Sequence, residues 1–220
     1  MKTKIDCQYM KRLYSFYSPF YDFVFGKLLE PGRREAFKHL LPKPNQKVLE
    51  IGIGTGTSLS LYPHNTHIVG IDISEGMIRK ARKRLASLGN GHKVELYVMD
   101  ACNLEFPDNS FDAVIASYVI TTVPDPHKLC REILRVIRPG GQIIAVQHSR
   151  GENGHFLERA KDVLAPLFVK IGFTTDLDVV RVMREAGIAI EHVCGCNLFK
   201  LHRLITGTKP WPEAQASTSH

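Results

Sequence analysis

The chain has 220 residues and a formal net charge of +7, which is enough chain for one domain with a full core. Hydrophobic residues make up 44% of it, an ordinary share for a soluble globular protein, and no apolar run approaches the ~20 residues of a membrane-spanning helix. The five scattered cysteines favour reduced thiols over a disulfide framework, and the first residues lack the apolar core of a signal peptide. We therefore expect a cytoplasmic protein.

The excess of basic residues says more about partners than about the fold. These residues form short groups at 33–34, 79–84 and 128–138. Such groups suit an anionic membrane surface, an acidic substrate or nucleic acid, or they serve only solubility. No nucleic-acid-binding motif accompanies them, so we expect no nucleic-acid partner.

The first predicted elements are helical. Residues 9–25 hold eight aromatic side chains with basic residues among them, and Pro19 divides this stretch into two short helices. A further helix is expected over 32–41. We interpret residues 1–41 as a helical lid that contacts the substrate and an anionic membrane. The alternative is that the aromatic residues form only the core face of a capping helix.

From Lys47 onward, apolar runs and amphipathic stretches alternate, which predicts a doubly wound parallel sheet with helices on both faces. Buried strands are expected at 47–51, 67–71, 94–98, 112–117 and 142–147, and helices at 55–62, 75–88 and 126–137.

The last third of the chain is expected to add helices at 152–171 and 176–186 and strands at 188–194 and 197–206. The two closing strands resemble a hairpin with Gly195 at its turn. The expected fold is therefore α/β, with a mostly parallel, seven-stranded, doubly wound sheet and a carboxyl-terminal antiparallel hairpin over residues 42–209. Residues 210–220 have no apolar period, and we expect a disordered tail.

A glycine-rich turn follows the first of these strands. Gly52, Gly54 and Gly56 alternate along it, and Glu50 lies two residues before the first glycine. Glycine lets the backbone approach a ligand closely, and a strand, a glycine turn and a helix start together form a nucleotide-type pocket. The same pattern also occurs in dinucleotide oxidoreductases, so the turn alone does not choose between cofactors.

Carboxylates end the next two strands. Asp72 follows the second strand, 20 residues after Gly52, and Asp100 closes the third. A carboxylate at the first position can accept both hydroxyls of a ribose, and one at the second can accept the amine of adenine. The pocket therefore suits a cofactor that contains adenosine.

Six short motifs then stand in register over residues 47–147. They read Glu-Ile-Gly-Ile-Gly-Thr-Gly, Gly-Ile-Asp-Ile-Ser, Met-Asp-Ala, Phe-Pro-Asp-Asn-Ser-Phe-Asp, Val-Pro-Asp-Pro and Arg-Pro-Gly-Gly. In their order and spacing this region resembles the class I S-adenosylmethionine-dependent methyltransferases. The resemblance implies S-adenosylmethionine as the cofactor and methyl transfer as the reaction.

The resemblance also implies a role for each residue of the pocket. Glu50 would pair with the methionine amino group, Asp72 would hold the ribose, and Asp100 would bind the adenine amine. The other implied contacts are Gly52, Gly54 and Gly56 beside the methionine portion, Ile73 and Met77 beside adenine, Ala101 through its backbone amide, and Ser117 facing the methionine portion. Gly56 has the alternative of serving only helix packing, and Met77 that of being ordinary core.

The amino-terminal segment is similar to that of the soluble bacterial phosphatidylethanolamine N-methyltransferases, where a Tyr-Asp-x-x-Phe-Gly stretch precedes a Gly-Arg-Arg helix. This resemblance implies a phospholipid amine as methyl acceptor. Tyr14, Tyr17 and Tyr21 would then form an aromatic lid over the ammonium group. His148, at the end of the fifth strand, would deprotonate or orient the amine; its alternative is a polar residue with a structural partner.

Other functions stay open from the sequence. Many small-molecule relatives, among them quinone methyltransferases, carry two histidines before Val-Pro-Asp, where this chain has Thr121 and Thr122. That departure disfavours a quinone acceptor. A nicotinamide oxidoreductase and a cofactor-binding regulatory module are further alternatives. A metal site is not expected, because the candidate ligands have a C-x-C spacing that is not usual for zinc; these are His192, Cys194, Cys196 and His202.

Overall fold

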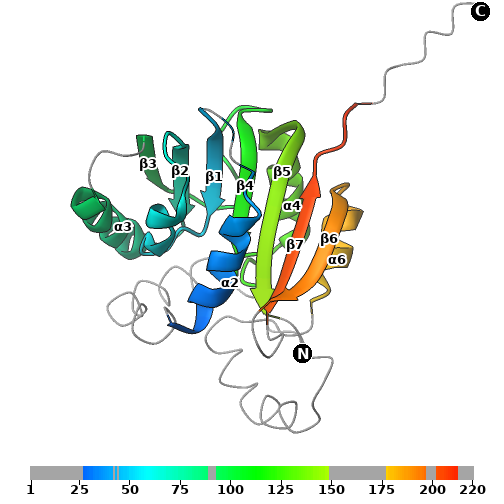
Figure 1. The fold of residues 1–220 in the computed structure, drawn as a ribbon. Helices are drawn as coiled ribbons and strands as arrows, with labels where there is room; N and C mark the ends of the chain where they lie inside the picture. The colour runs from blue at the N-terminus through cyan, green and yellow to red at the C-terminus, as the bar shows by residue number, and fades with distance from the viewer. Residues whose placement is uncertain are drawn as a thin grey trace, which may run out of the picture.

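The computed structural model describes residues 27–41, 43, 45–88, 93–148, 177–196 and 202–212. A seven-stranded sheet runs through this part of the chain in the order β3-β2-β1-β4-β5-β7-β6 (Figure 1). The strands are β1 (Lys47–Ile51), β2 (His67–Asp72), β3 (Lys93–Val98), β4 (Phe111–Ser117), β5 (Ile137–His148), β6 (Ala189–Cys196) and β7 (His202–Thr208).

The first five strands are parallel, whereas β7 is antiparallel to both β5 and β6. The predicted fold class, a mostly parallel doubly wound sheet with an antiparallel carboxyl-terminal hairpin, is thereby confirmed. The order of the parallel strands reverses between β1 and β4. At such a switch point, the carboxyl ends of adjacent strands leave a crevice that commonly binds ligands.

Helices cover both faces of the sheet (Figure 1). Their bounds are α2 (Lys27–Lys38), the 3-10 helix η2 (Thr57–Leu61), α3 (Glu75–Leu88), α4 (Pro126–Val136) and α6 (Val179–Glu185). One buried core packs α2, η2 and α3 on one face, and a second core packs α4 and α6 on the other. This three-layer arrangement explains why β1, β2 and β4 are buried almost throughout, since both of their faces are covered, whereas the edge strand β3 is largely exposed.

Three local predictions are wrong in detail. Helix α2 begins at Lys27 rather than near residue 32, and Pro31 lies inside it, just after the first turn, where it removes one i→i−4 hydrogen bond. The element after the glycine turn is a short 3-10 helix, η2, rather than a longer α-helix. Gly195 is not at the hairpin turn, because it lies within β6 opposite Arg203.

One arginine fixes the loop between β3 and β4. Arg135 on α4 donates to the backbone carbonyls of Leu104 and Phe106, at 2.7 Å each, and pairs with Glu132 and Asp108. These two carbonyls belong to no strand, so the hydrogen bonds from Arg135 take the place of the backbone hydrogen bonds that a sheet would give them.

The expected lid is described only in α2; the aromatic stretch that precedes α2 lies outside the described residues. Of the expected tail, Trp211 lies against Gly140 near the start of β5, and 213–220 lie outside the described residues. No helix in the described part of the chain is long and apolar enough to cross a bilayer.

Candidate functional site

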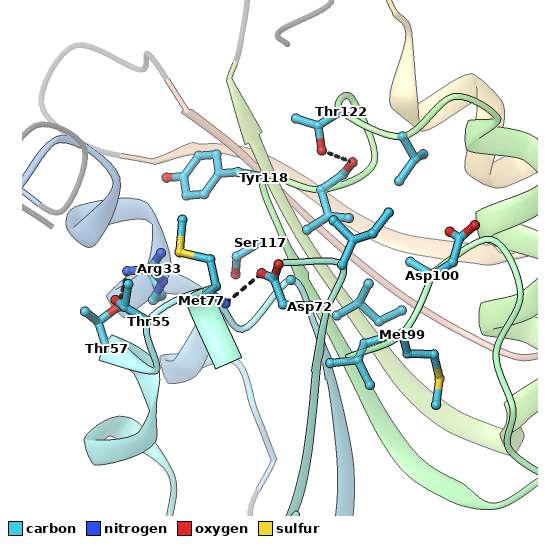
Figure 2. A pocket seen from close by; sticks show the side chains of 18 of the residues that line it. Arg33, Thr55, Thr57, Asp72, Met77, Met99, Asp100, Ser117, Tyr118 and Thr122 are labelled. Carbon is cyan, nitrogen blue, oxygen red and sulfur yellow. Dashed lines mark hydrogen bonds between the residues drawn. The ribbon is translucent and has the colours of Figure 1, made fainter. Parts of the chain in front are cut away.

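A cleft opens at the carboxyl ends of β1, β2 and β4 and encloses about 930 Å³, counting space open to solvent. Figure 2 shows Asp72 and Ser117 near its centre, Arg33 and Thr57 on one side, and Met99 and Asp100 on the other. Ten residues were implied to contact the cofactor. Eight of them line this cleft: Gly52, Gly54, Asp72, Ile73, Met77, Asp100, Ala101 and Ser117.

The glycine turn has a left-handed backbone at its three glycines, with φ of 73°, 58° and 75° at Gly52, Gly54 and Gly56. Other residues rarely adopt this conformation. A Cβ on Gly52 would overlap the side chain of Val119, whereas a Cβ on Gly54 would meet open space, with only the Gly52 carbonyl oxygen 4.0 Å away. Gly54 is therefore the glycine that opens the backbone to a ligand.

Glu50 and Gly56 lie outside the set of residues that line the cleft. A Cβ on Gly56 would crowd Leu59 and Ala81, so this glycine packs η2 against α3. Glu50 is buried, and its Oε2 accepts hydrogen bonds from Ser58 Oγ at 2.8 Å and Tyr62 Oη at 2.9 Å. Burial raises the pKa of Glu50, while those two donors and the charge of Arg33 oppose the rise.

Asp72 joins the glycine turn to the end of β2. One carboxylate oxygen accepts from the Gly54 N–H at 3.1 Å and the other from the Ser74 N–H at 2.8 Å. The side chain faces the cleft and keeps partial exposure, yet protein atoms surround the carboxyl closely. Desolvation therefore raises its pKa to about 6, and the two N–H donors limit the rise.

At the opposite end of the cleft, the carboxylate of Asp100 accepts from the Cys102 N–H at 2.8 Å. The side chains of Ile73, Met77 and Met99 also line the cleft; Figure 2 shows Met99 on the same side as Asp100, and Met77 toward Arg33. Met77 is almost fully buried, so it is both core and cleft wall. A carboxylate that accepts hydrogen bonds, in a cleft lined by flexible apolar side chains, suits a flat aromatic base.

Ser117 ends β4 in the middle of the cleft. It is buried, and its Oγ has no hydrogen-bond partner among the described residues. A buried hydroxyl without a partner is costly. The position of Ser117 in the cleft wall therefore calls for a polar ligand group there.

Arg33 is the residue of the site that the sequence argument did not single out. It reaches the cleft from α2, half-buried, and its Nη1 donates to Thr57 Oγ1 at 2.6 Å. The Gly-Arg-Arg motif contained it, but only as a mark of resemblance. A guanidinium beside the glycine turn provides a site for a carboxylate at that end of the cleft.

Of the residues predicted to bind the methyl acceptor, the structure describes only His148. Tyr14, Tyr17 and Tyr21 lie outside the described residues. His148 ends β5, and its backbone pairs with that of His202 in β7. Two residues before it, Val146 pairs with Ser117 of the cleft wall, so His148 follows the strand toward the same edge of the sheet.

The two threonines and the cysteine–histidine set have identifiable positions. Thr122 lines the cleft, and its hydroxyl donates to the Val119 carbonyl at 2.9 Å. His202 is buried against Tyr118, whereas His192 and Cys194 are exposed on β6. Within the described ranges, no group of three or more His, Cys, Asp or Glu side chains is placed to hold a metal ion.

Comparison with known proteins gives a consistent result. A model of the methyltransferase domain matches residues 49–145, the stretch that holds the glycine turn and the strands β2 to β5. A phosphatidylethanolamine N-methyltransferase from Cereibacter sphaeroides is 36% identical over 170 residues, which cover 77% of this chain and 83% of that protein.

One further sequence match and one structural match are also informative. A demethylmenaquinone methyltransferase from Clavibacter sepedonicus is 40% identical over 109 residues, 49% of this chain and 43% of that protein. In structure, phosphoethanolamine N-methyltransferase 2 from Haemonchus contortus, solved with S-adenosyl-L-methionine, superposes with a TM-score of 0.68 at 19% identity, covering 90% of this chain and 57% of that one.

Proposed function

Because this chain belongs to the class I S-adenosylmethionine-dependent methyltransferases, we propose that it methylates the amine headgroup of a phospholipid, phosphatidylethanolamine. The observation that carries the proposal is the extent of the similarity to the Cereibacter enzyme, which covers 83% of that protein, whereas the matches to demethylmenaquinone methyltransferases cover 43% to 66% of those proteins. The first match, over 170 residues, is therefore longer than residues 49–145, the stretch that the methyltransferase-domain model matches. Products would be the mono-, di- or trimethylated lipid.

S-adenosylmethionine is the cofactor of this family, and the residues of the cleft fit it. Its methionine portion needs a cation and an open backbone, which Arg33 and Gly54 provide. Its sugar needs acceptors, which Asp72 provides, and the hydroxyl of Ser117 lies between the two ends of the cleft (Figure 2). When bound, the cofactor supplies an activated methyl group on a sulfonium sulfur.

The individual roles follow from these positions. Arg33 would bind the carboxylate of the methionine portion, and Glu50, behind the glycine turn, would bind its ammonium group directly or through water. Asp72 would accept both ribose hydroxyls. Asp100 would accept the adenine amine, with Ile73 and Met77 against the ring.

The acceptor amine sets a separate requirement. An ammonium headgroup must lose a proton before its nitrogen lone pair can form the new N–C bond. Among the described residues that line the cleft, Asp72 and Asp100 are the carboxylates, and both are assigned to the donor. The proton acceptor is therefore sought in His148, at the end of β5, or in a hydroxyl of the lid tyrosines Tyr14, Tyr17 and Tyr21.

A lid that excludes water would also favour the uncharged amine. Aromatic faces hold methylated ammonium groups well, because the ring quadrupole attracts a cation that has little hydration to lose. The same aromatic and basic segment suits peripheral contact with an anionic membrane, where a lipid acceptor resides.

A quinone precursor is the second candidate acceptor, and the quinone enzymes among the relatives favour it. Thr121 and Thr122 count against it, because Thr122 uses its hydroxyl on the Val119 carbonyl and neither side chain has a pKa suited to general-base catalysis.

The deciding experiment supplies methyl-labelled donor with phosphatidylethanolamine in mixed detergent micelles, and in parallel with demethylmenaquinone. We expect label in the lipid headgroup and none in the quinone. Label only in the quinone would reverse the assignment. The Tyr17→Phe and His148→Ala variants are measured beside the wild type, and unchanged turnover in both would remove the lid-and-base proposal.

A further inference from the structure

Tyr118, the residue directly after β4, has a backbone conformation that its side chain does not favour. Its φ is 61°, in the left-handed region, where a bulky residue without glycine's freedom is strained. Such strain persists only where surrounding contacts hold it, and it is concentrated at functional sites. Tyr118 also lines the cleft, although its hydroxyl points away from Asp72 and Ser117, toward α2 (Figure 2).

The hydroxyl of Tyr118 has two buried partners. It donates to the carbonyl oxygen of Leu29 in α2 at 3.2 Å, and it lies 3.1 Å from Nδ1 of His202 in β7. Since the single hydroxyl proton is used on the carbonyl, the arrangement is satisfied when a neutral His202 carries its proton on Nδ1 and donates to the tyrosine oxygen. Burial lowers the pKa of His202, which agrees with a neutral ring.

Helix α2 meets this pair through a glycine. A Cβ on Gly32 would overlap the Tyr118 hydroxyl and would lie 2.9 Å from His202 Nδ1 and 3.1 Å from Val146 Cγ1. The backbone of α2 therefore contacts the hydroxyl directly, without a side chain between them. The contact requires glycine at this position of α2.

The next residue along α2 is Arg33, which reaches the cleft and donates to Thr57. The axial position and rotation of α2 determine where this guanidinium lies. Leu29 and Gly32, which Tyr118 contacts, lie in the turn of α2 that directly precedes Arg33.

We propose that Tyr118 is a positioning residue that fixes α2 through its hydroxyl, supported by His202, and so places Arg33 for the donor's carboxylate. The inference rests on the proposed donor-binding role of the cleft. In this role Tyr118 affects binding of the methyl donor through Arg33, and its own side chain does not contact the donor's carboxylate.

The test compares two ligands that differ only in the carboxylate. S-adenosylhomocysteine carries it, and decarboxylated S-adenosylhomocysteine keeps the amine, thioether and adenosine but lacks it. Dissociation constants are measured by calorimetry for the wild type, Tyr118→Phe and Arg33→Ala. We expect Arg33→Ala to weaken the carboxylate-bearing ligand roughly 10- to 100-fold and Tyr118→Phe to weaken it roughly 3- to 10-fold. Neither variant should change affinity for the decarboxylated ligand.

The double variant shows whether Tyr118 acts through Arg33. If it does, Tyr118→Phe adds no further loss to Arg33→Ala, whereas independent effects would multiply. Gly32→Ala is a second perturbation of the same contact that keeps both side chains, and it should show the same selective loss. Tyr97→Phe is the matched control, because it removes an exposed hydroxyl on β3 that bonds Glu95 and does not line the cleft.

Equal loss for both ligands, or no loss for either, in Tyr118→Phe and Gly32→Ala would overturn the proposal. A selective loss that multiplies with that of Arg33→Ala would overturn it as well. Methyl transfer to phosphatidylethanolamine is scored separately on the wild type, so an error in the acceptor does not affect the result for Tyr118.

Discussion

The Asp72 carboxylate accepts a hydrogen bond from the Gly54 backbone N–H at 3.1 Å. The glycine turn after β1 and the end of β2 are thereby joined at the floor of the cleft. The group that would hold the ribose also holds the backbone that would receive the methionine portion, so the charge on Asp72 affects both halves of the donor site.

Donor affinity is therefore expected to depend on the ionisation of Asp72, whose pKa is raised to about 6. A raised carboxyl pKa means that the folded protein retains the proton below this pH, where the uncharged group is a weaker acceptor for ribose hydroxyls. Affinity for S-adenosylhomocysteine should rise about tenfold between roughly pH 5 and pH 7. Calorimetry of Asp72→Asn should show weaker binding and a flat profile; a flat wild-type profile would contradict this account.

Two glycines of the turn should respond differently to substitution. Gly54→Ala places a methyl group in open space, so we expect a loss of about 1–2 kcal/mol in unfolding free energy from the left-handed backbone and a large loss of donor affinity. Gly52→Ala also overlaps Val119 and should cost about 2–5 kcal/mol. Denaturant titration measures both variants, and equal stabilities would refute the distinction.

Glu50→Gln should separate stability from donor binding. Burial raises the pKa of Glu50, so the folded state binds more protons than the unfolded state and stability falls as pH rises through the shifted value. Above the shifted pKa the charge is present and opposes folding. The amide variant should melt at a higher temperature there and bind S-adenosylhomocysteine more weakly; a lower melting temperature would show that the bonds from Ser58 and Tyr62 outweigh the burial of charge.

Arg135→Ala tests the clamp on the β3–β4 loop, by which we mean the hydrogen bonds from the Arg135 guanidinium to that loop. It removes the donors to the carbonyls of Leu104 and Phe106, and we expect a loss of about 1–3 kcal/mol in unfolding free energy. Arg181→Ala is the control, because that arginine is exposed and pairs with Glu185; its loss should stay under about 1 kcal/mol. Similar losses in the two variants would mean that the clamp adds little.

The elements that could be predicted are those whose cause is local. Apolar runs fix the parallel strands, and the end of each strand places Asp72 and Asp100 at one edge of the sheet regardless of the loops between them. The position of Gly54 could be predicted for the same reason, because it follows the end of β1. Its left-handed backbone is needed where the turn leaves β1, and the structure places it in the cleft wall.

The parts that could not be predicted depend on contacts between distant segments. Arg33 reaches the cleft from α2, whose Leu29 carbonyl accepts a hydrogen bond from Tyr118, the residue after β4. No periodicity in α2 reveals that contact. Gly56 has the spacing of a ligand glycine but packs on Ala81. The left-handed Tyr118 has no sequence signal, since tyrosine rarely adopts that conformation.

A crystal structure with bound S-adenosylhomocysteine would show whether this cleft is the donor site. We expect the ligand to lie in the cleft, with its carboxylate on Arg33, its ribose hydroxyls on Asp72 and its adenine between Ile73 and Asp100. A ligand bound elsewhere, or bound here in the reverse direction with adenine beside Arg33, would contradict it.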